Sequence, residues 1–228
     1  MNEASPIPAP QEVRIPIAHT WLHGDLAVPP QAFGLVLFAH GSGSGRHSAR
    51  NRLVARRLQE ARIATLLFDL LTLEEEQVDL RTAEHRFDIA LLTRRVEAAA
   101  QWTRSDPRLR ELPLGLFGAS TGSAAALIAA AQLGSSVRAV VSRGGRPDLA
   151  GPAALAAVQA PTLLIVGGAD QGVIELNEHA LALLRCPNRL EIVPRATHLF
   201  EEPGTLEAVA DLAAAWFTRH LQAARLPA

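Results

Sequence analysis

Short apolar runs recur along the chain and alternate with longer, partly polar segments. Six of these runs cover residues 34–40, 64–70, 114–120, 137–143, 161–167 and 189–195. Their apolar residues are consecutive rather than alternating, which is typical of parallel strands that are buried on both faces. Two further β-like stretches within 13–29 are separated by a short break, and we predict that they pair antiparallel at the sheet edge. The pattern therefore predicts a sheet of about eight strands.

The segments between these runs have the spacing of helices. In three of them, apolar residues share one helical face: Val54, Leu58 and Ala61; Ile89, Leu92, Val96 and Ala99; Leu206, Val209, Ala213 and Trp216. A fourth segment, 120–134, is apolar nearly all round, so it is expected to form the most buried helix. Strands that alternate with helices predict the α/β class, with a mostly parallel open sheet flanked by helices and right-handed crossovers.

The chain has 228 residues, and no linker-like stretch interrupts its middle. We expect one domain over 13–228, preceded by a flexible N-terminal extension over 1–12. Segment 71–85 is acidic and polar, which favours a solvated surface loop over a gating element. Connection 144–160 has room for one short helix, so no large lid domain is expected.

Charge and composition exclude several classes of partner. The formal net charge is −1 and the positive residues are dispersed, so neither a nucleic acid nor an anionic membrane surface is an expected partner. The chain has no lysine and no tyrosine, which excludes a Schiff-base lysine and a tyrosine acid. Cys186 is the only cysteine, and no Cys/His cluster suggests a metal site, so we expect no metal and no cofactor.

The N-terminal residues lack the basic start and the apolar stretch of a secretory signal. No segment has the unbroken apolar length of a membrane span. We therefore expect a cytoplasmic protein that acts on a small molecule. The sequence does not indicate the oligomeric state.

A glycine-serine-glycine turn joins the run 114–120 to the apolar helix. Residues Gly118-Ala119-Ser120-Thr121-Gly122 match G-x-S-x-G, in which a sharp strand-to-helix turn exposes the serine hydroxyl. The bare pattern also arises by chance, but its position between a strand and a helix favours catalysis over a small residue in a tight corner. Ser120 is therefore the candidate nucleophile.

Two further polar residues follow later strand runs. Asp170 comes after the run 161–167, and His198 comes after the run 189–195. Alone, Asp170 could be a turn or helix-cap residue and His198 a hydrogen-bonded loop residue. Together with Ser120 they have the chain order Ser, Asp, His, and each is placed at the carboxyl end of a strand. We predict that His198 acts as the base and that Asp170 orients it.

Acyl transfer also needs hydrogen-bond donors for the oxyanion. The helix that begins after the nucleophile offers the backbone N–H of Thr121. The second donor is expected from the glycine-rich loop after the first central strand. There we favour the N–H of Ser42, with Gly41 or Gly43 as alternatives.

Three residues at strand ends are candidates for substrate binding: His40, Arg46 and Arg143. A guanidinium pairs well with a carboxylate, so either arginine could hold a substrate carboxylate. A structural ion pair or loop hydrogen bonds are the alternative for each arginine.

Five segments carry a resemblance to the α/β-hydrolase superfamily, and within it to the compact dienelactone-hydrolase-like branch: "AHGSGSGRHSARN", "GLFGASTGSAAA", "VSRGGRPDL", "LLIVGGAD" and "ATHLFEEPG". The resemblance covers about Val13 to Leu221 and implies an α/β-hydrolase fold. It also implies ester hydrolysis through a Ser-His-Asp triad and an acyl-enzyme. Because the short connection 144–160 leaves no lid, we expect a shallow site suited to small or short-acyl substrates. Dienelactone hydrolases carry a cysteine nucleophile where this chain has Ser120, so a serine esterase on a related scaffold is expected.

Two other interpretations stay open. The loop "HGSGSGR" with Asp69 after the next strand is similar to a dinucleotide-binding fingerprint, but Arg46 stands at the third glycine position. That interpretation leaves the serine, aspartate and histidine unexplained. The other is a hydrolase scaffold without turnover that serves as a binding or regulatory module, against which the intact triad residues argue.

Overall fold

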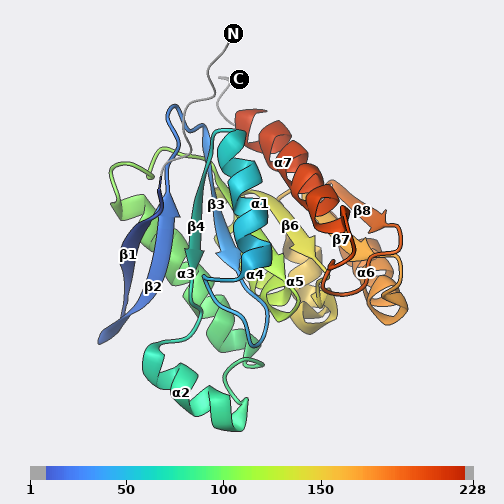
Figure 1. Cartoon of the computed structure of the whole chain (residues 1–228), viewed down its shortest axis with the longest axis horizontal. Coiled ribbons are helices and arrows are strands. Elements are labelled where there is room, and N and C mark those ends of the chain that lie inside the picture. Colours follow the sequence, from blue (N-terminus) through green and yellow to red (C-terminus); the bar gives the residue numbers. More distant parts are fainter. Residues whose placement is uncertain (1–8, 224–228) are drawn as a thin grey trace.

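Eight strands form one sheet in the computed structural model, which describes residues 9–223 (Figure 1). The strands are β1 (Gln11–Ile17), β2 (Thr20–Ala27), β3 (Gly34–Ala39), β4 (Ile63–Phe68), β5 (Leu114–Ala119), β6 (Val137–Arg143), β7 (Thr162–Gly167) and β8 (Asn188–Val193). Their order across the sheet is β1-β2-β4-β3-β5-β6-β7-β8. β2 runs antiparallel to β1 and β4, and the other neighbouring pairs are parallel. The predicted mostly parallel α/β sheet, with an antiparallel pair at its edge, is confirmed.

Of the predicted N-terminal extension, residues 1–8 lie outside the described residues. Gln11 and Glu12 belong to β1, so the sheet begins two residues before the expected domain start.

The central strands are buried along their whole length. Every residue of β3, β4, β5 and β7 is buried because helices cover both faces of the sheet. β1 instead alternates, with Val13, Ile15 and Ile17 buried and Arg14 and Pro16 exposed. An edge strand with one face against the core needs apolar residues only at every second position. The consecutive and alternating patterns therefore follow from position in the sheet.

Helices cover both faces of the sheet in the described part of the chain. They are α1 (Ala49–Glu60), α2 (Leu73–Thr82), α3 (Ile89–Ser105), α4 (Thr121–Leu133), α5 (Gly151–Ala157), α6 (Gln171–Leu183) and α7 (Thr205–Ala223). Helices α1 and α7 pack together on one face, while α3, α4, α5 and α6 cover the other (Figure 1). Helix α4 is buried over most of its surface, as its composition predicts.

The prediction of a loop over 71–85 was wrong, because most of this segment forms α2. Thr72 and Glu75 make a capping box at its N-terminus, and Ala83 ends it with a left-handed φ of 57°. Asp79 is its one buried residue and pairs with Arg86 at 2.6 Å. α2 stands off from the sheet beyond the carboxyl ends of the central strands (Figure 1). Helix α2 therefore lies at the end of the sheet where open α/β proteins bind their ligands.

The connection 144–160 has the expected size. It holds one turn of 3-10 helix (Pro147–Ala150) and the short helix α5, which leaves no room for a lid domain. Among residues 9–223, no helix combines the length and apolar character that crossing a membrane requires.

Candidate active site

Ser120 lies on the sharp turn between β5 and α4. Its backbone has φ 50° and ψ −122°, a positive φ that costs a residue with a side chain on the order of 1–3 kcal/mol. Three backbone hydrogen bonds hold the turn. Ser120 N–H donates to the carbonyl of Arg143 at 3.2 Å, and the carbonyl of Ser120 accepts from Ser123 N–H at 3.0 Å and from Arg146 N–H at 3.1 Å. The side chain is therefore held, partly exposed, at the carboxyl end of the sheet.

Two glycines allow α4 to begin directly behind this turn. A Cβ at Gly122 would lie 2.3 Å from the carbonyl oxygen of Ala39, and a Cβ at Gly118 would lie 2.5 Å from Ser123 Cα. Both distances are far below the separation of about 3.5 Å at which non-bonded atoms attract. The two glycines of G-x-S-x-G are thus a steric requirement of the turn.

Asp170 and His198 meet beyond the carboxyl ends of β7 and β8. His198 Nδ1 lies 2.7 Å from Asp170 Oδ2. Asp170 occupies the N-cap position of α6 but its side chain makes no capping hydrogen bond there. An ionised carboxylate only accepts, so Nδ1–H donates to Asp170, and in the neutral form of the ring the unprotonated nitrogen is then Nε2. This is the arrangement that a histidine base needs.

Backbone at the end of β6 connects Ser120 to His198. The carbonyl of Arg143 accepts from Ser120 N–H, and a Cβ at Gly144 would lie 3.6 Å from His198 Cε1. Within residues 9–223, His198 is hydrogen-bonded to Asp170 and not to Ser120. Such nucleophile–base bonds are often long before substrate binds. The predicted serine, aspartate and histidine therefore all lie beyond the carboxyl ends of the strands. Of their possible contacts, the one between the aspartate and the histidine is formed.

The loop after β3 lies directly against Ser120. A Cβ at Gly41 would lie 3.1 Å from Ser120 Cβ. The Gly41 carbonyl accepts from Ser44 N–H at 3.2 Å and from His40 Nδ1–H at 2.9 Å. In a trans peptide the carbonyl and the next N–H point in opposite directions, so these bonds turn Ser42 N–H away from the loop's own acceptors. Thr121 N–H, at the start of α4, is one of the donors that a helix N-terminus leaves free.

His40 was a candidate for substrate binding. It is buried beside this loop, and its ring contacts backbone groups of the protein. Leu70 N–H donates to Nε2 at 3.0 Å, so Nε2 is unprotonated and Nδ1–H donates to Gly41. Burial lowers the pKa of His40 because the charged ring would lose its hydration. Both ring nitrogens are engaged by backbone groups, so His40 links the loop to the end of β4.

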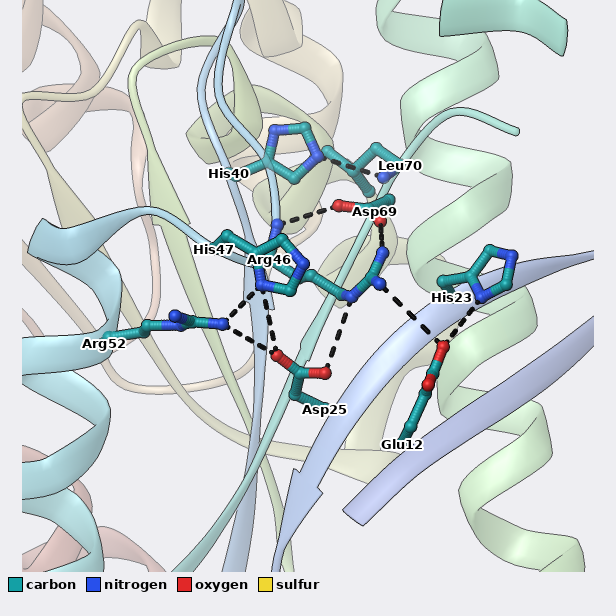
Figure 2. A network of polar contacts seen from close by, with 9 residues as sticks. All are labelled: Glu12, His23, Asp25, His40, Arg46, His47, Arg52, Asp69 and Leu70. Carbon is teal, nitrogen blue, oxygen red and sulfur yellow. Dashed lines mark hydrogen bonds and ion pairs between the residues drawn. The ribbon is translucent and has the colours of Figure 1, made fainter. Parts of the chain in front are cut away.

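Arg46, the first candidate arginine, is held in an ion-pair network (Figure 2). Its backbone N–H donates to Asp69 Oδ1 at 2.8 Å, and its guanidinium pairs with Asp69 Oδ2. Asp25 Oδ1 lies 3.5 Å from Nε, and Glu12 Oε1 lies 3.9 Å from Nη2. The network continues from Asp25 to Arg52 and His47 and from Glu12 to His23. Arg46 therefore has the structural ion pair that was the alternative to substrate binding.

The same contacts argue against a dinucleotide site. Asp69, the residue proposed to hold a ribose, is neutralised by Arg46. The glycine-rich loop is closed against Ser120 at Gly41.

Arg143, the second candidate arginine, is buried and has no carboxylate partner among residues 9–223. It is 7% exposed, and its Nε and Nη1 have no hydrogen-bond partner among the described residues. Burial, together with the positive charge of Arg50, lowers the pKa of Arg143 to about 10. The group therefore keeps its charge at neutral pH.

A cavity of about 200 Å³ opens beside the loop after β3. Its lining comprises the loop residues 40–44, the apolar side chains of Leu70, Leu71, Leu80 and Leu92, and the charged side chains of Asp69, Glu76, Asp79 and Arg86. The contribution of α2 was not predicted, because the acidic and polar composition of its segment is typical of a solvated loop. The T-x-x-E capping box at Thr72 was the signal that could have revealed the helix.

Comparisons with known proteins identify a family model, solved structures and a relative that are similar to this chain. A family model described as "Alpha/beta hydrolase domain" matches residues 32–211. A dienelactone hydrolase from Anabaena variabilis, known from a crystal structure, has 57% sequence identity to this chain. The two structures match with a TM-score of 0.91, over 93% of this chain and 99% of that one. Est1E from Butyrivibrio proteoclasticus shares the fold, with 15% identity, a TM-score of 0.78, and 92% and 99% of the two chains covered.

A Mycobacterium tuberculosis protein with the name "Putative phosphoribosyl transferase" is 56% identical over 211 residues. The match covers 92% of this chain and 46% of that protein, so the chain spans a little less than half the length of this relative.

Proposed function

Because the chain belongs to the α/β-hydrolase family, in its dienelactone-hydrolase-like branch, we propose that it is a serine hydrolase of small or short-acyl esters. The nucleophile in this proposal is Ser120, the base is His198, and Asp170 orients the base. The observation that carries the proposal is the 2.7 Å contact between His198 Nδ1 and Asp170 Oδ2. This contact lies at the carboxyl ends of the strands, as does the strained turn at Ser120.

The proposed reaction has two halves. Ser120 Oγ attacks the ester carbonyl and passes its proton to His198 Nε2, while Asp170 stabilises the imidazolium. The tetrahedral intermediate then expels the alcohol, which takes the proton from His198 and leaves an acyl-serine. Water attacks this acyl group with His198 again as base, which releases the acid and restores Ser120.

Two backbone donors serve the oxyanion in this mechanism. Thr121 N–H comes from the start of α4, and Ser42 N–H comes from the loop that touches Ser120 through Gly41. Loss of one such donor typically raises the barrier by about 3 kcal/mol, so the orientation of the Gly41–Ser42 peptide matters for rate. We assign His40 to this task as a positioning residue.

The cavity adjoins Ser120 through its lining residue Gly41, and its size suits a small substrate. Its volume of about 200 Å³ is below the range of 300–1,000 Å³ usual for drug-sized ligands. Apolar side chains such as Leu70 and Leu92 suit a short acyl or alcohol group. The name of the mycobacterial relative applies to a protein of which this chain matches 46%, so we assign only the hydrolase reaction to this chain.

Labelling with a fluorophosphonate tests the proposal directly. We expect the reagent to phosphonylate Ser120, because only an activated serine attacks it at a useful rate. Peptide mapping by mass spectrometry identifies the modified residue. Failure to label, or labelling of another serine, would favour the alternative of a binding or regulatory module without turnover.

Substitutions at His40 should separate its two hydrogen bonds. In His40→Asn the side-chain amide can still donate to the Gly41 carbonyl, whereas in His40→Gln it can reach only toward Leu70 N–H. We expect kcat to fall about tenfold more in His40→Gln than in His40→Asn, with KM nearly unchanged in both, because the oxyanion donor acts only in the transition state. Steady-state kinetics on p-nitrophenyl acetate measure this difference. Equal losses in the two variants, matched by equal losses of thermal stability, would indicate a purely structural role.

A further inference from the structure

Backbone, rather than a bond between the two side chains, sets the spacing of Ser120 and His198. Within residues 9–223, His198 is hydrogen-bonded to Asp170 and not to Ser120. In the proposed reaction a proton passes between the serine and the histidine, and a misplacement of about 1 Å can lower such a rate by about 10²-fold. A segment that contacts both residues therefore bears on catalysis.

Residues 143–146, which we call the bridging segment, make such contacts. The segment accepts a hydrogen bond from Ser120 N–H at 3.2 Å and donates one to the Ser120 carbonyl at 3.1 Å. On its other side, a Cβ at Gly144 would lie 3.2 Å from the His198 carbonyl oxygen and 3.6 Å from His198 Cε1. A shift of the bridging segment would thus move the proposed nucleophile relative to the proposed base.

Two glycines form the centre of the bridging segment. Gly144 has a positive φ of 49°, and a Cβ at Gly145 would lie only 2.0 Å from Ser142 Oγ. Without side chains, this backbone has more conformational freedom than any other pair of residues would give it. Its position therefore depends on hydrogen bonds from neighbouring elements.

Asn177 of α6 provides one of these hydrogen bonds. Its Nδ2 donates to the Gly145 carbonyl at 3.0 Å and to the carbonyl of Val173, one turn earlier in α6, at 2.8 Å. Among the described residues, Asn177 is the one side chain that hydrogen-bonds to the backbone of the bridging segment. The contact thus joins this backbone to α6.

The burial of Asn177 points to a role beyond packing. The side chain is 0% exposed, and its Oδ1 has no hydrogen-bond partner among residues 9–223. An unpaired polar atom in the interior is unfavourable, and a leucine of similar volume would avoid it. Residues that lower stability in this way are expected where function requires them.

Asp170 lies on the same side of α6 as Asn177. Asp170 is the N-cap residue of this helix and precedes Asn177 by seven positions, which is about two helical turns. Its carboxylate contacts His198 Nδ1 at 2.7 Å. Asn177 therefore connects the backbone beside Ser120 to the helix that carries the proposed orienting aspartate.

We propose that Asn177 is a positioning residue, whose hydrogen bond to Gly145 holds the bridging segment against α6 and keeps Ser120 Oγ within reach of His198 Nε2. The inference rests on the proposed function and deepens it. Asn177 makes no contact with the substrate in this role, so its loss should lower kcat and leave KM nearly unchanged.

Two substitutions separate the hydrogen bonds of Asn177. In Asn177→Thr the hydroxyl can still donate to the Val173 carbonyl, as threonine does within helices, but it is too short to reach Gly145. Asn177→Leu removes both bonds. We expect each variant to lower kcat for p-nitrophenyl acetate about tenfold or more, with KM changed less than about twofold.

Gln59→Leu is the matched control, because Gln59 is another buried helix amide and donates to Thr65 Oγ1 at 2.7 Å on α1. It should keep the wild-type kcat even where thermal unfolding shows a comparable loss of stability. A wild-type kcat in Asn177→Thr and Asn177→Leu would overturn the inference.

The effect of Asn177 should also require the base. In the His198→Ala background there is no imidazole whose distance from Ser120 matters, so Asn177→Leu should lower the remaining enzyme-dependent kcat less than about twofold. A general disturbance of the fold would lower the rate by the same factor in both backgrounds. Equal factors would therefore reduce Asn177 to a structural residue and contradict the inference.

Hydrogen exchange over residues 143–150, followed by mass spectrometry, tests the anchor without a substrate. We expect faster exchange in both Asn177 variants than in the wild type and in Gln59→Leu. Unchanged exchange, or faster exchange with unchanged kcat, would overturn the inference and leave the proposed function intact. A wild type that neither hydrolyses esters nor reacts with a fluorophosphonate would contradict the proposed function, and the positioning role with it.

Discussion

Replacement of Ser120 by alanine is expected to lower kcat for p-nitrophenyl acetate by roughly 10⁴-fold or more, with little change in KM. In the proposed mechanism the substitution removes the oxygen that forms the acyl-enzyme, so residual catalysis would come from substrate binding and the oxyanion donors alone. The turn should survive, because its three backbone hydrogen bonds involve no side-chain atom of Ser120. Purified variant and wild type are compared by steady-state kinetics and by thermal unfolding.

Ser135→Ala is the matched control, since Ser135 is an exposed serine in the 3-10 turn after α4. It should hydrolyse the ester at the wild-type rate. Hydrolysis by Ser120→Ala at a rate near that of the control would remove Ser120 from the mechanism.

Replacement of His198 by alanine is expected to cost about as much as loss of the serine. Without the imidazole, Ser120 Oγ has no group to accept its proton, and the contact of Nδ1 with Asp170 Oδ2 shows that Nε2 is the nitrogen available for this task. Because these residues act as a unit, the double variant Ser120→Ala/His198→Ala should be only slightly slower than either single variant. Kinetics on all three variants measure the coupling.

His19→Ala serves as the control, because His19 is exposed in the turn between β1 and β2. Losses that multiply in the double variant would mean that the serine and the histidine act independently. In that case the assignment of His198 as the base of Ser120 would be wrong.

The strands and the turn at Ser120 were predictable because their signals are local. A strand covered on both faces needs consecutive apolar residues, and β3, β5 and β7 lie within the apolar runs that predicted them. The glycines at 118 and 122 are required by atoms a few residues away or in the adjacent strand, which is why a five-residue pattern identifies the turn. The chain order of Ser120, Asp170 and His198, which follow β5, β7 and β8, completed the prediction of the site.

The sequence did not predict that residues 73–82 form helix α2, and the reason is physical. A helix that stands off from the sheet buries little, and Asp79 is its one buried residue, so its apolar periodicity is weak. Its stability relies on the Thr72–Glu75 capping box and on acidic residues in its first turn, features of the helix end rather than of a buried face.

Short-range patterns in the chain thus specify the type and order of the elements, the strained serine turn and the residues offered at the strand ends. They do not distinguish Arg46 from Arg143, which both lie near the carboxyl end of a strand and were both candidates for substrate binding. Arg46 meets Asp69, 23 positions along the chain, because β3 and β4 pair in parallel. The bond of His40 to Leu70, 30 positions away, arises in the same way. Arg143 meets no carboxylate among the described residues. Such ion-pair partners depend on how distant segments of the chain pack together, and no local sequence pattern encodes that packing.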